Sequence, residues 1–312
     1  MGEKSKKSGE IGEKISTELL KLIGWNNSLH NISIACNSPK HKNEEGNQRS
    51  THGEDQVFIY HSPFHDDRTE IVHVSVKNTL GGPPSEATLK TKFKSHFKEC
   101  QEIIECAKHS PEVKLISNSH GTRGKKGHSG LLVWLHNDGS DIECNIKPSL
   151  ASSRLEPDAK FPIYLIDNAR ASFLIKIIDD MNRRFQDKKI EFFYPRIGTS
   201  VYVNEARSGS SLPLELIASD VVPFLVKSDD SREMVIYADQ AFTKDAYKKL
   251  LSYALQFSSG LVAKIKIGMP DYNPALNEQE AKLARLHFPD RDEEITPFSF
   301  NRSILSLLST ED

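Results

Sequence analysis

The sequence lacks the features that define several common classes of protein. No stretch approaches the roughly 18 consecutive apolar residues of a membrane span, and the basic segment MGEKSKKSGE has no apolar run behind it. The motifs GxxxxGK[ST], GxSxG and GxGxxG are absent, so the sequence offers no phosphate-binding loop, nucleophile elbow or dinucleotide fingerprint. We therefore expect a cytoplasmic protein without membrane association, whose chemistry depends on another arrangement of residues.

Cysteine is also scarce and scattered. Cys36, Cys100, Cys106 and Cys144 form no CxxC pair, which argues against a zinc site and against a disulfide framework. The twelve histidines form no HxH, HExxH or HxxxH pattern on a helix with a partnering acid, which argues against zinc-dependent hydrolysis. We expect free thiols in a reducing cytosol.

Excess charge of one sign is missing as well. The chain has 312 residues, 41 Lys and Arg against 43 Asp and Glu, and a net charge of -2. With 37% hydrophobic and 27% charged residues, the composition is that of an ordinary folded protein. Any nucleic-acid-binding surface must therefore come from local clusters of Lys and Arg.

Apolar periodicity predicts an α/β fold in the first half of the chain. Helical spacing marks 10–23 and 86–108, and strand-like runs occupy 30–37, 55–61, 70–78 and 131–138. On the third of these strands, three valines share one face. Period-two geometry places His73, Ser75 and Lys77 together on the other face.

Asp55 stands at the start of one strand and Lys77 near the end of the next. In this element order the arrangement resembles the PD-(D/E)XK nuclease superfamily, over roughly residues 8–137. The resemblance is best in the Mrr-like restriction endonuclease group, whose first-helix glutamate precedes an LxxxGW-like segment. Here GEIGEKISTELLKLIGW offers Glu13, with Glu10 as a second choice. The chain is also similar to nuclease-type subunits of bacterial anti-phage defence loci.

The resemblance implies a restriction-endonuclease-like mixed sheet flanked by helices, and a site that holds Mg²⁺ or Mn²⁺. Asp55, Glu13 and the Val76 carbonyl would bind the metal, and Lys77 would lie near the scissile phosphate of DNA. A hard cation bound by oxygen atoms polarises a phosphoryl group and lowers the pKa of a bound water.

One position departs from the family pattern. Where the family has an acid or glutamine two residues before the lysine, this sequence has Ser75, and a hydroxyl is a weaker metal ligand than a carboxylate. Glu70, Glu102 or Glu105 could supply the missing acid, and His73 could compensate for it.

Ordinary structural roles remain open for the same residues. Asp55 could open a strand after a glycine turn, Lys77 could protect an edge strand, and Glu13 could be a solvent-exposed helix residue. Gln101 could point toward the site from the second helix, or lie in solvent.

The candidate nucleic-acid-binding residues are Lys94, Arg123, Lys125 and Lys126. Lysines on a helix usually form a solvated face. The segment HGTRGKKGHSG, residues 120–130, is predicted to be a mobile basic loop near the site that can close on phosphates.

We expect two domains, a nuclease-like domain over 1–150 and a second α/β region over 151–312 that serves recognition or assembly. The runs MVIYAD, TKDAYKKLLSYALQF and VAKIKIGM predict a parallel strand-helix-strand crossover in the second region. We expect a homodimer or a hetero-oligomer with a second defence-system subunit.

Two functions remain open from the sequence. The first is a metal-dependent nuclease that hydrolyses DNA phosphodiester bonds in bacterial anti-phage defence. The second is a catalytically inactive nuclease-fold subunit that binds nucleic acid or scaffolds a catalytic partner, and Ser75 favours it.

Overall fold

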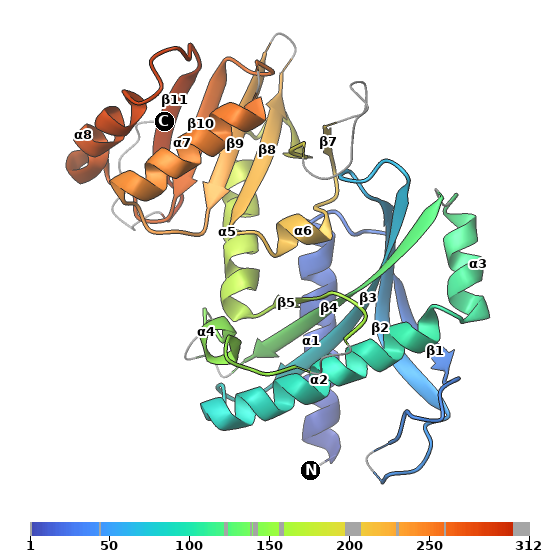
Figure 1. Cartoon of the computed structure of the whole chain (residues 1–312). Helices are drawn as coiled ribbons and strands as arrows, with labels where there is room; N and C mark the ends of the chain where they lie inside the picture. Colours follow the sequence, from blue (N-terminus) through green and yellow to red (C-terminus); the bar gives the residue numbers. More distant parts are fainter. Residues whose placement is uncertain are drawn as a thin grey trace. The chain divides into compact units, whose positions relative to one another are not determined.

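A computed structural model describes residues 2–301, except 44, 122–123, 138, 140–142, 156–158, 197–206, 229–230 and 259. The chain divides into two compact units, Met1–Ser172 and Phe173–Asp312 (Figure 1). This division lies after the boundary expected at residue 150, because strand β5 (Ile163–Ile166) pairs with β4 (Lys125–His136) and so belongs to the first unit.

The first unit is a five-stranded mixed sheet in the order β1-β2-β3-β4-β5. Strand β2 is antiparallel to both β1 and β3, whereas β3, β4 and β5 run parallel to one another. Its other strands are β1 (Leu29–Ala35), β2 (Thr51–His61) and β3 (Arg68–Thr79). Its helices are α1 (Gly2–Leu22), α2 (Glu86–Ala107), α3 (Pro111–Ser119) and α4 (Lys147–Leu150). The structure confirms the predicted mixed sheet flanked by helices.

Helix α1 packs on the face of β3 that carries the valines. The Ser8 hydroxyl donates to the Asn78 carbonyl at 2.9 Å, and the Asn78 amide donates to the Ser8 carbonyl at 2.8 Å. Gly12 sits directly over Asn78, where a Cβ atom would collide with the Asn78 Cβ. The helix therefore approaches the strand closely because Gly12 has no side chain.

Helix α2 covers the opposite face (Figure 1). Ile103, Cys106 and Ala107 of this helix join a buried core with Val57 and Ile71 of the sheet. Because both faces of the sheet are covered, the polar residues on the α2 side of β3 lie in the interior of the unit.

The predicted basic loop over 120–130 is wrong in its second half. Residues from Lys125 onward belong to β4, which pairs with β3 from Lys125 opposite Arg68 onward. A Cβ atom at Gly127 would collide with the side chains of Arg68 and Glu70, and one at Gly130 would collide with Ile163. These glycines permit close packing within the sheet. The loop prediction failed because it rested on glycine content alone.

The second unit contains a six-stranded sheet in the order β11-β10-β9-β8-β6-β7. Its strands are β6 (Lys189–Phe193), β7 (Ser208–Gly209), β8 (Val221–Lys227), β9 (Arg232–Ala238), β10 (Lys264–Met269) and β11 (Glu294–Ser299). The helices are α5 (Asn168–Arg184), which spans the division between the units, α6 (Leu214–Ile217), α7 (Lys244–Ser258) and α8 (Pro274–Arg285).

The predicted crossover is confirmed, because β9 and β10 are parallel and α7 connects them. Strand β11 was not predicted, since Pro297 interrupts its pattern, but a proline is tolerated on an edge strand. The run TSVYVNE, residues 199–205, whose alternation predicts a further strand, lies outside the described residues. Within the described part of the chain, no helix is long and apolar enough to cross a membrane.

The two glycines of α1 provide a matched test of its packing. We expect Gly12→Ala to lower the free energy of unfolding by about 1–2 kcal/mol, because overpacking outweighs the gain in helix propensity. We expect Gly9→Ala to raise it by about 0.5–1 kcal/mol, since nothing lies within 4 Å of a Cβ there. Urea unfolding measures both values, and a shift in the same direction for both would contradict this packing.

Candidate active site

The strands β2 and β3 separate at Asp55. Their ladder ends at the pair Gln56 and Val74, and the next donor, the Val76 amide, bonds to Asp55 Oδ2 at 2.6 Å. A side-chain carboxylate thus takes the place of a backbone acceptor at the point where the two strands diverge.

The alternation of side chains between the two faces of β2 changes at the same point. Val57 lies opposite His73 in the ladder, and Glu54 also contacts the His73 side chain. Residues three apart on one regular strand face opposite sides, so a local irregularity must lie between Glu54 and Val57. Gln56 bonds to Thr17 of α1 at 2.9 Å, on the other face. Asp55 stands at this irregularity.

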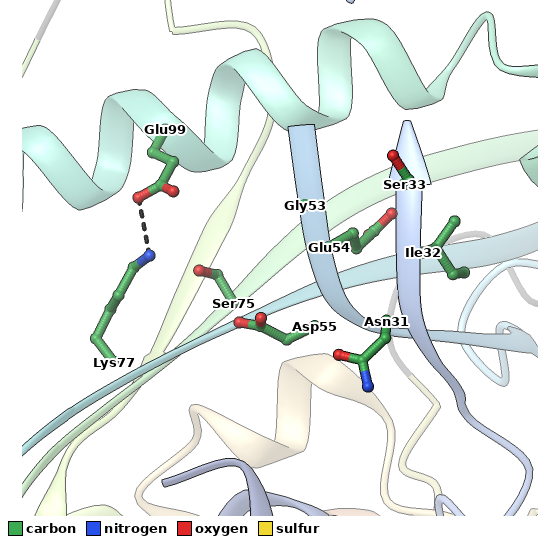
Figure 2. A pocket seen from close by; sticks show the side chains of 9 residues that line it. All are labelled: Asn31, Ile32, Ser33, Gly53, Glu54, Asp55, Ser75, Lys77 and Glu99. Carbon is green, nitrogen blue, oxygen red and sulfur yellow. Dashed lines mark ion pairs between the residues drawn. The ribbon is translucent and has the colours of Figure 1, made fainter. Parts of the chain in front are cut away.

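A pocket of about 250 Å³ opens where the strands separate (Figure 2). Its lining comes from β1, β2, β3 and α2, and consists of Asn31, Ile32, Ser33, Gly53, Glu54, Asp55, Ser75, Lys77 and Glu99. The structure therefore brings together three of the predicted catalytic residues, Asp55, Ser75 and Lys77.

Glu99 is an acidic residue of the pocket lining that the sequence analysis did not select. It projects from α2 into the pocket, where its Oε2 lies 2.9 Å from Lys77 Nζ (Figure 2). Its neighbour Cys100 is buried against the sheet, with 3% exposed. The signal available in the sequence was a charged residue next to the buried stripe of α2, the helix that follows β3.

Glu54 adds a third carboxylate. It is 2% exposed and bonds to His73 Nδ1 through Oε1 at 2.5 Å. Its other oxygen, Oε2, is buried without a hydrogen-bond partner among the described residues. On its far side, His73 contacts His128 Nδ1 at 3.0 Å, and burial together with His73 lowers the pKa of His128 to about 3. His73 therefore holds the Glu54 side chain in place through this hydrogen bond.

The electrostatics of the pocket favour a cation. Burial raises the pKa of Asp55, and the Val76 amide and Lys77 oppose this rise only in part. Three carboxylates, Glu54, Asp55 and Glu99, face one lysine, Lys77. This excess of carboxylate oxygens, of which Glu54 Oε2 is buried without a hydrogen-bond partner among the described residues, fits a hard divalent cation.

Two predicted metal ligands do not line the pocket. Glu13 is half-buried on α1, the helix that packs on the opposite face of β3. Val76 takes part through its amide, which donates to Asp55. Their role at the metal stays a prediction.

The other acids considered for the missing position are also outside the pocket lining. Glu70 pairs with Arg68, Glu102 with Lys98, and Glu105 with Lys160. Gln101 is committed elsewhere too. Its amide donates to the carbonyl of residue 161 at 2.6 Å and accepts the amides of residues 160 and 161.

The predicted nucleic-acid-binding residues are dispersed. Lys94 is exposed on α2, and Arg123 lies outside the described residues. Lys125 and Lys126 are exposed at the start of β4, where Lys126 donates to Ser117 at 2.8 Å. Lys125 lies opposite Arg68 in the ladder with β3. Nine residues of strand, about 30 Å, therefore separate this end from Lys77, so the basic segment is not near the pocket.

The fold and the pocket together define a nuclease domain of the PD-(D/E)XK superfamily. A family model described as the GAPS4 protein PD-(D/E)XK nuclease domain matches residues 1–170. The chain belongs to this family, which confirms the resemblance to PD-(D/E)XK nucleases of anti-phage defence. No curated protein matches the chain significantly.

Asp55→Asn tests the electrostatics of the pocket. Because burial raises the pKa of Asp55 in the folded protein, ionisation of this carboxyl lowers the stability of the wild type as the pH rises from the pKa of the unfolded chain to the raised pKa, and the loss is complete above it. Asparagine can still accept the Val76 amide. We expect the variant to melt about 2–4 °C above the wild type at neutral pH without added metal, equivalent to about 1 kcal/mol.

The advantage of the variant should vanish at pH values below the pKa of Asp55 in the unfolded chain, where the wild-type carboxyl is protonated in both states. Thermal unfolding followed across this range measures the difference. A variant that melts lower than the wild type at neutral pH would contradict the assignment.

Proposed function

We propose that this protein is a Mg²⁺-dependent endodeoxyribonuclease of bacterial anti-phage defence, able to use Mn²⁺ in place of Mg²⁺, and that it acts in the cytoplasm. The observation that carries the proposal is the convergence of Asp55, Glu99 and Lys77 at the point where β2 and β3 separate. Nucleases of this fold generally use divalent metals.

Asp55 and Glu99 would hold the cation, with Glu54 Oε2 within the same pocket. When bound, the cation would polarise the phosphoryl group and lower the pKa of an attacking water. The carboxylate of Glu99 would replace the acid that the family has at the position of Ser75. We also keep the prediction that Glu13 and the Val76 carbonyl contribute to metal binding.

Lys77 would stabilise the charge that develops on the phosphate. Its ammonium group is held in the pocket by Glu99 at 2.9 Å, so it needs no large movement to face a substrate. In hydrolysis, the water oxygen forms a bond to phosphorus as the ester P–O bond breaks. The leaving oxygen gains a proton, and a phosphate monoester and a hydroxyl result.

Ser75 would act as a neutral group of the pocket lining, and Cys100, which lies outside that lining, as a neutral buried group of α2. Ser75 is 5% exposed, and burial raises the pKa of the Cys100 thiol to about 12. The thiol therefore stays protonated and offers no competing nucleophile.

Plasmid cleavage tests the proposal. With Mg²⁺ or Mn²⁺, we expect the wild type to nick supercoiled DNA, and we expect Asp55→Asn, Glu99→Gln and Lys77→Ala each to lose at least about 100-fold in rate. The matched control is Glu102→Gln on the same helix, which should retain wild-type activity because Glu102 does not line the pocket. EDTA should abolish cleavage.

The assay needs two arms, the protein alone and the protein with the product of a neighbouring gene, because the domain family belongs to a defence context. Equal behaviour of wild type and variants in both arms would overturn the proposal. It would favour the second function, a nuclease-fold subunit that binds nucleic acid or scaffolds a partner, for which the presence of Ser75 at the acid position is the supporting observation.

We also propose that the protein assembles as a homodimer or with a second defence subunit, and that residues 151–312 serve this assembly. Light scattering at micromolar concentration should give a mass above that of one chain. A sharply monomeric profile, both alone and with the neighbouring gene product, would count against assembly.

A further inference from the structure

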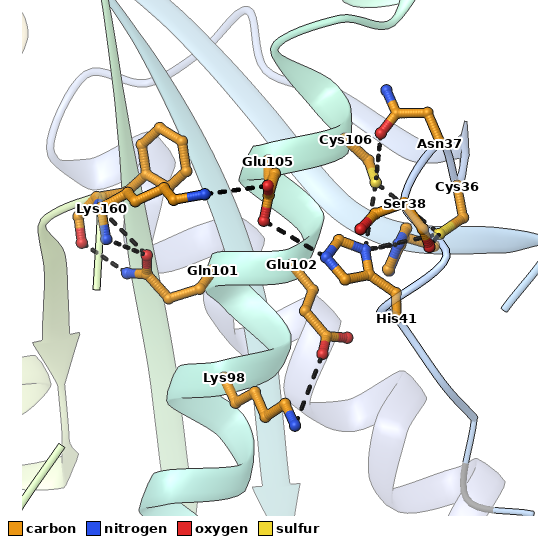
Figure 3. Close-up of polar contacts among 12 residues, drawn as sticks. Cys36, Asn37, Ser38, His41, Lys98, Gln101, Glu102, Glu105, Cys106 and Lys160 are labelled. Carbon is orange, nitrogen blue, oxygen red and sulfur yellow. Dashed lines mark hydrogen bonds and ion pairs between the residues drawn. The ribbon is translucent and has the colours of Figure 1, made fainter. Parts of the chain in front are cut away.

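Four potential metal ligands meet at one end of the first sheet, apart from the candidate active site. Cys36 follows β1, His41 lies in the connection between β1 and β2, His52 is on β2, and Cys106 is on α2. One ligand atom from each residue lies within 4.8 Å of all the others. Figure 3 shows Cys36, His41 and Cys106 directed toward one another.

Four of the six distances between these atoms are close to those of a tetrahedral site, and the other two, from His52 to the two sulfurs, are at most 4.8 Å. Zn–S bonds of about 2.3 Å and Zn–N bonds of about 2.05 Å separate two sulfurs by about 3.8 Å, sulfur and nitrogen by about 3.6 Å, and two nitrogens by about 3.3 Å. Here Cys36 Sγ and Cys106 Sγ are 3.9 Å apart. His41 Nδ1 lies 3.6 Å from Cys36 Sγ, 3.4 Å from Cys106 Sγ and 3.3 Å from His52 Nε2.

We propose that Cys36, His41, His52 and Cys106 bind one structural Zn²⁺ ion. Two thiolates and two neutral imidazoles around Zn²⁺ make a closed tetrahedral complex with no net charge and no open position, which suits a structural rather than a catalytic zinc. The proposal does not depend on nuclease activity.

Burial of the cluster supports a bound cation. His52 and Cys106 are 0% exposed and His41 is 4% exposed. The ligand atoms therefore lie away from solvent, as those of a structural zinc site do.

A carboxylate orients one of the ligands from outside. His41 would bind the metal through Nδ1, and its Nε2 lies 3.5 Å from Glu105 Oε2 (Figure 3). Glu105 is held in turn by Lys160, at 3.1 Å (Figure 3). A carboxylate behind a ligating histidine is the usual arrangement in zinc proteins, because it fixes the tautomer and the ring orientation.

Two other uses of these residues fit less well. A two-iron cluster with the same ligand types holds the cysteines on one iron and the histidines on the other, whereas here His41 lies as close to both sulfurs as to His52. A disulfide between Cys36 and Cys106 would make no use of the two buried histidines that lie beside the sulfurs.

The ion would connect the elements that carry the candidate active site. His52 stands three residues before Asp55 on β2, and Cys106 stands seven residues, about two turns, after Glu99 on α2. A metal bond between β2 and α2 at this end would fix how far the helix reaches along the sheet, and with it the distance between the two carboxylates.

Metal analysis of the full-length protein, purified under reducing conditions without chelator, tests the proposal. We expect about one zinc per chain, and tetrahedral thiolate-to-cobalt absorption after exchange of the zinc for Co²⁺. Cys106→Ser and His52→Gln should each reduce the zinc content at least about tenfold. Cys144→Ser, a cysteine outside the cluster, should retain it.

Wild-type protein with less than about a tenth of a zinc per chain, and no cobalt absorption after reconstitution, would overturn the inference. So would a Cys36–Cys106 disulfide found by mass spectrometry in protein extracted under non-reducing conditions. Neither readout requires the variants to fold or the protein to cut DNA.

Discussion

The hydrogen bond from the Val76 amide to the Asp55 carboxylate is the constraint on which the candidate site depends. It ends the backbone ladder between β2 and β3 and keeps a carboxylate at the point where the strands diverge. Without that divergence, the space that Ser75, Lys77 and Glu99 line would be closed by strand pairing. This arrangement places a carboxylate where burial disfavours its ionised form. Groups in such unfavourable environments are typical of functional positions.

Helix α2 is the second support. Its buried stripe holds it on the sheet, Glu99 projects from it into the pocket, and Cys106, near its C-terminal end, lies beside Cys36, His41 and His52. The pocket therefore contains groups from two directions, the diverging strands and the covering helix. A zinc ion at one end of the helix would make the position of Glu99 less sensitive to fluctuations of the connection between β1 and β2.

Sequence patterns predicted the elements well where periodicity is local. The first helix, the hairpin of β2 and β3, α2 and the crossover of β9 and β10 follow from apolar spacing. The pairing of Asp55 with Lys77 followed from the family resemblance. Sequence patterns failed where tertiary contacts determine the local structure. At Gly127 and Gly130, close strand packing requires glycine. At β11, the edge position of the strand tolerates Pro297.

Glu99 in the pocket and the cluster of Cys36, His41, His52 and Cys106 were not predicted from the sequence, for one physical reason. Glu99 lies 22 residues after Lys77, and Cys106 lies 70 residues after Cys36. Spacing rules detect ligands that share a turn or a helix face, whereas these groups meet only because α2 folds back over the sheet. The absence of a CxxC pair therefore argued against a zinc site without excluding one assembled by tertiary structure.

Binding of Mn²⁺, followed by the electron paramagnetic resonance of the free ion, tests the central claim most directly. The account predicts a site in the wild type that Asp55→Asn and Glu99→Gln each weaken at least about tenfold and that Glu102→Gln leaves unchanged. Affinity should fall as the pH is lowered toward the raised pKa of Asp55. Wild-type protein that binds no Mn²⁺, or binds it as well without Glu99, would contradict the account.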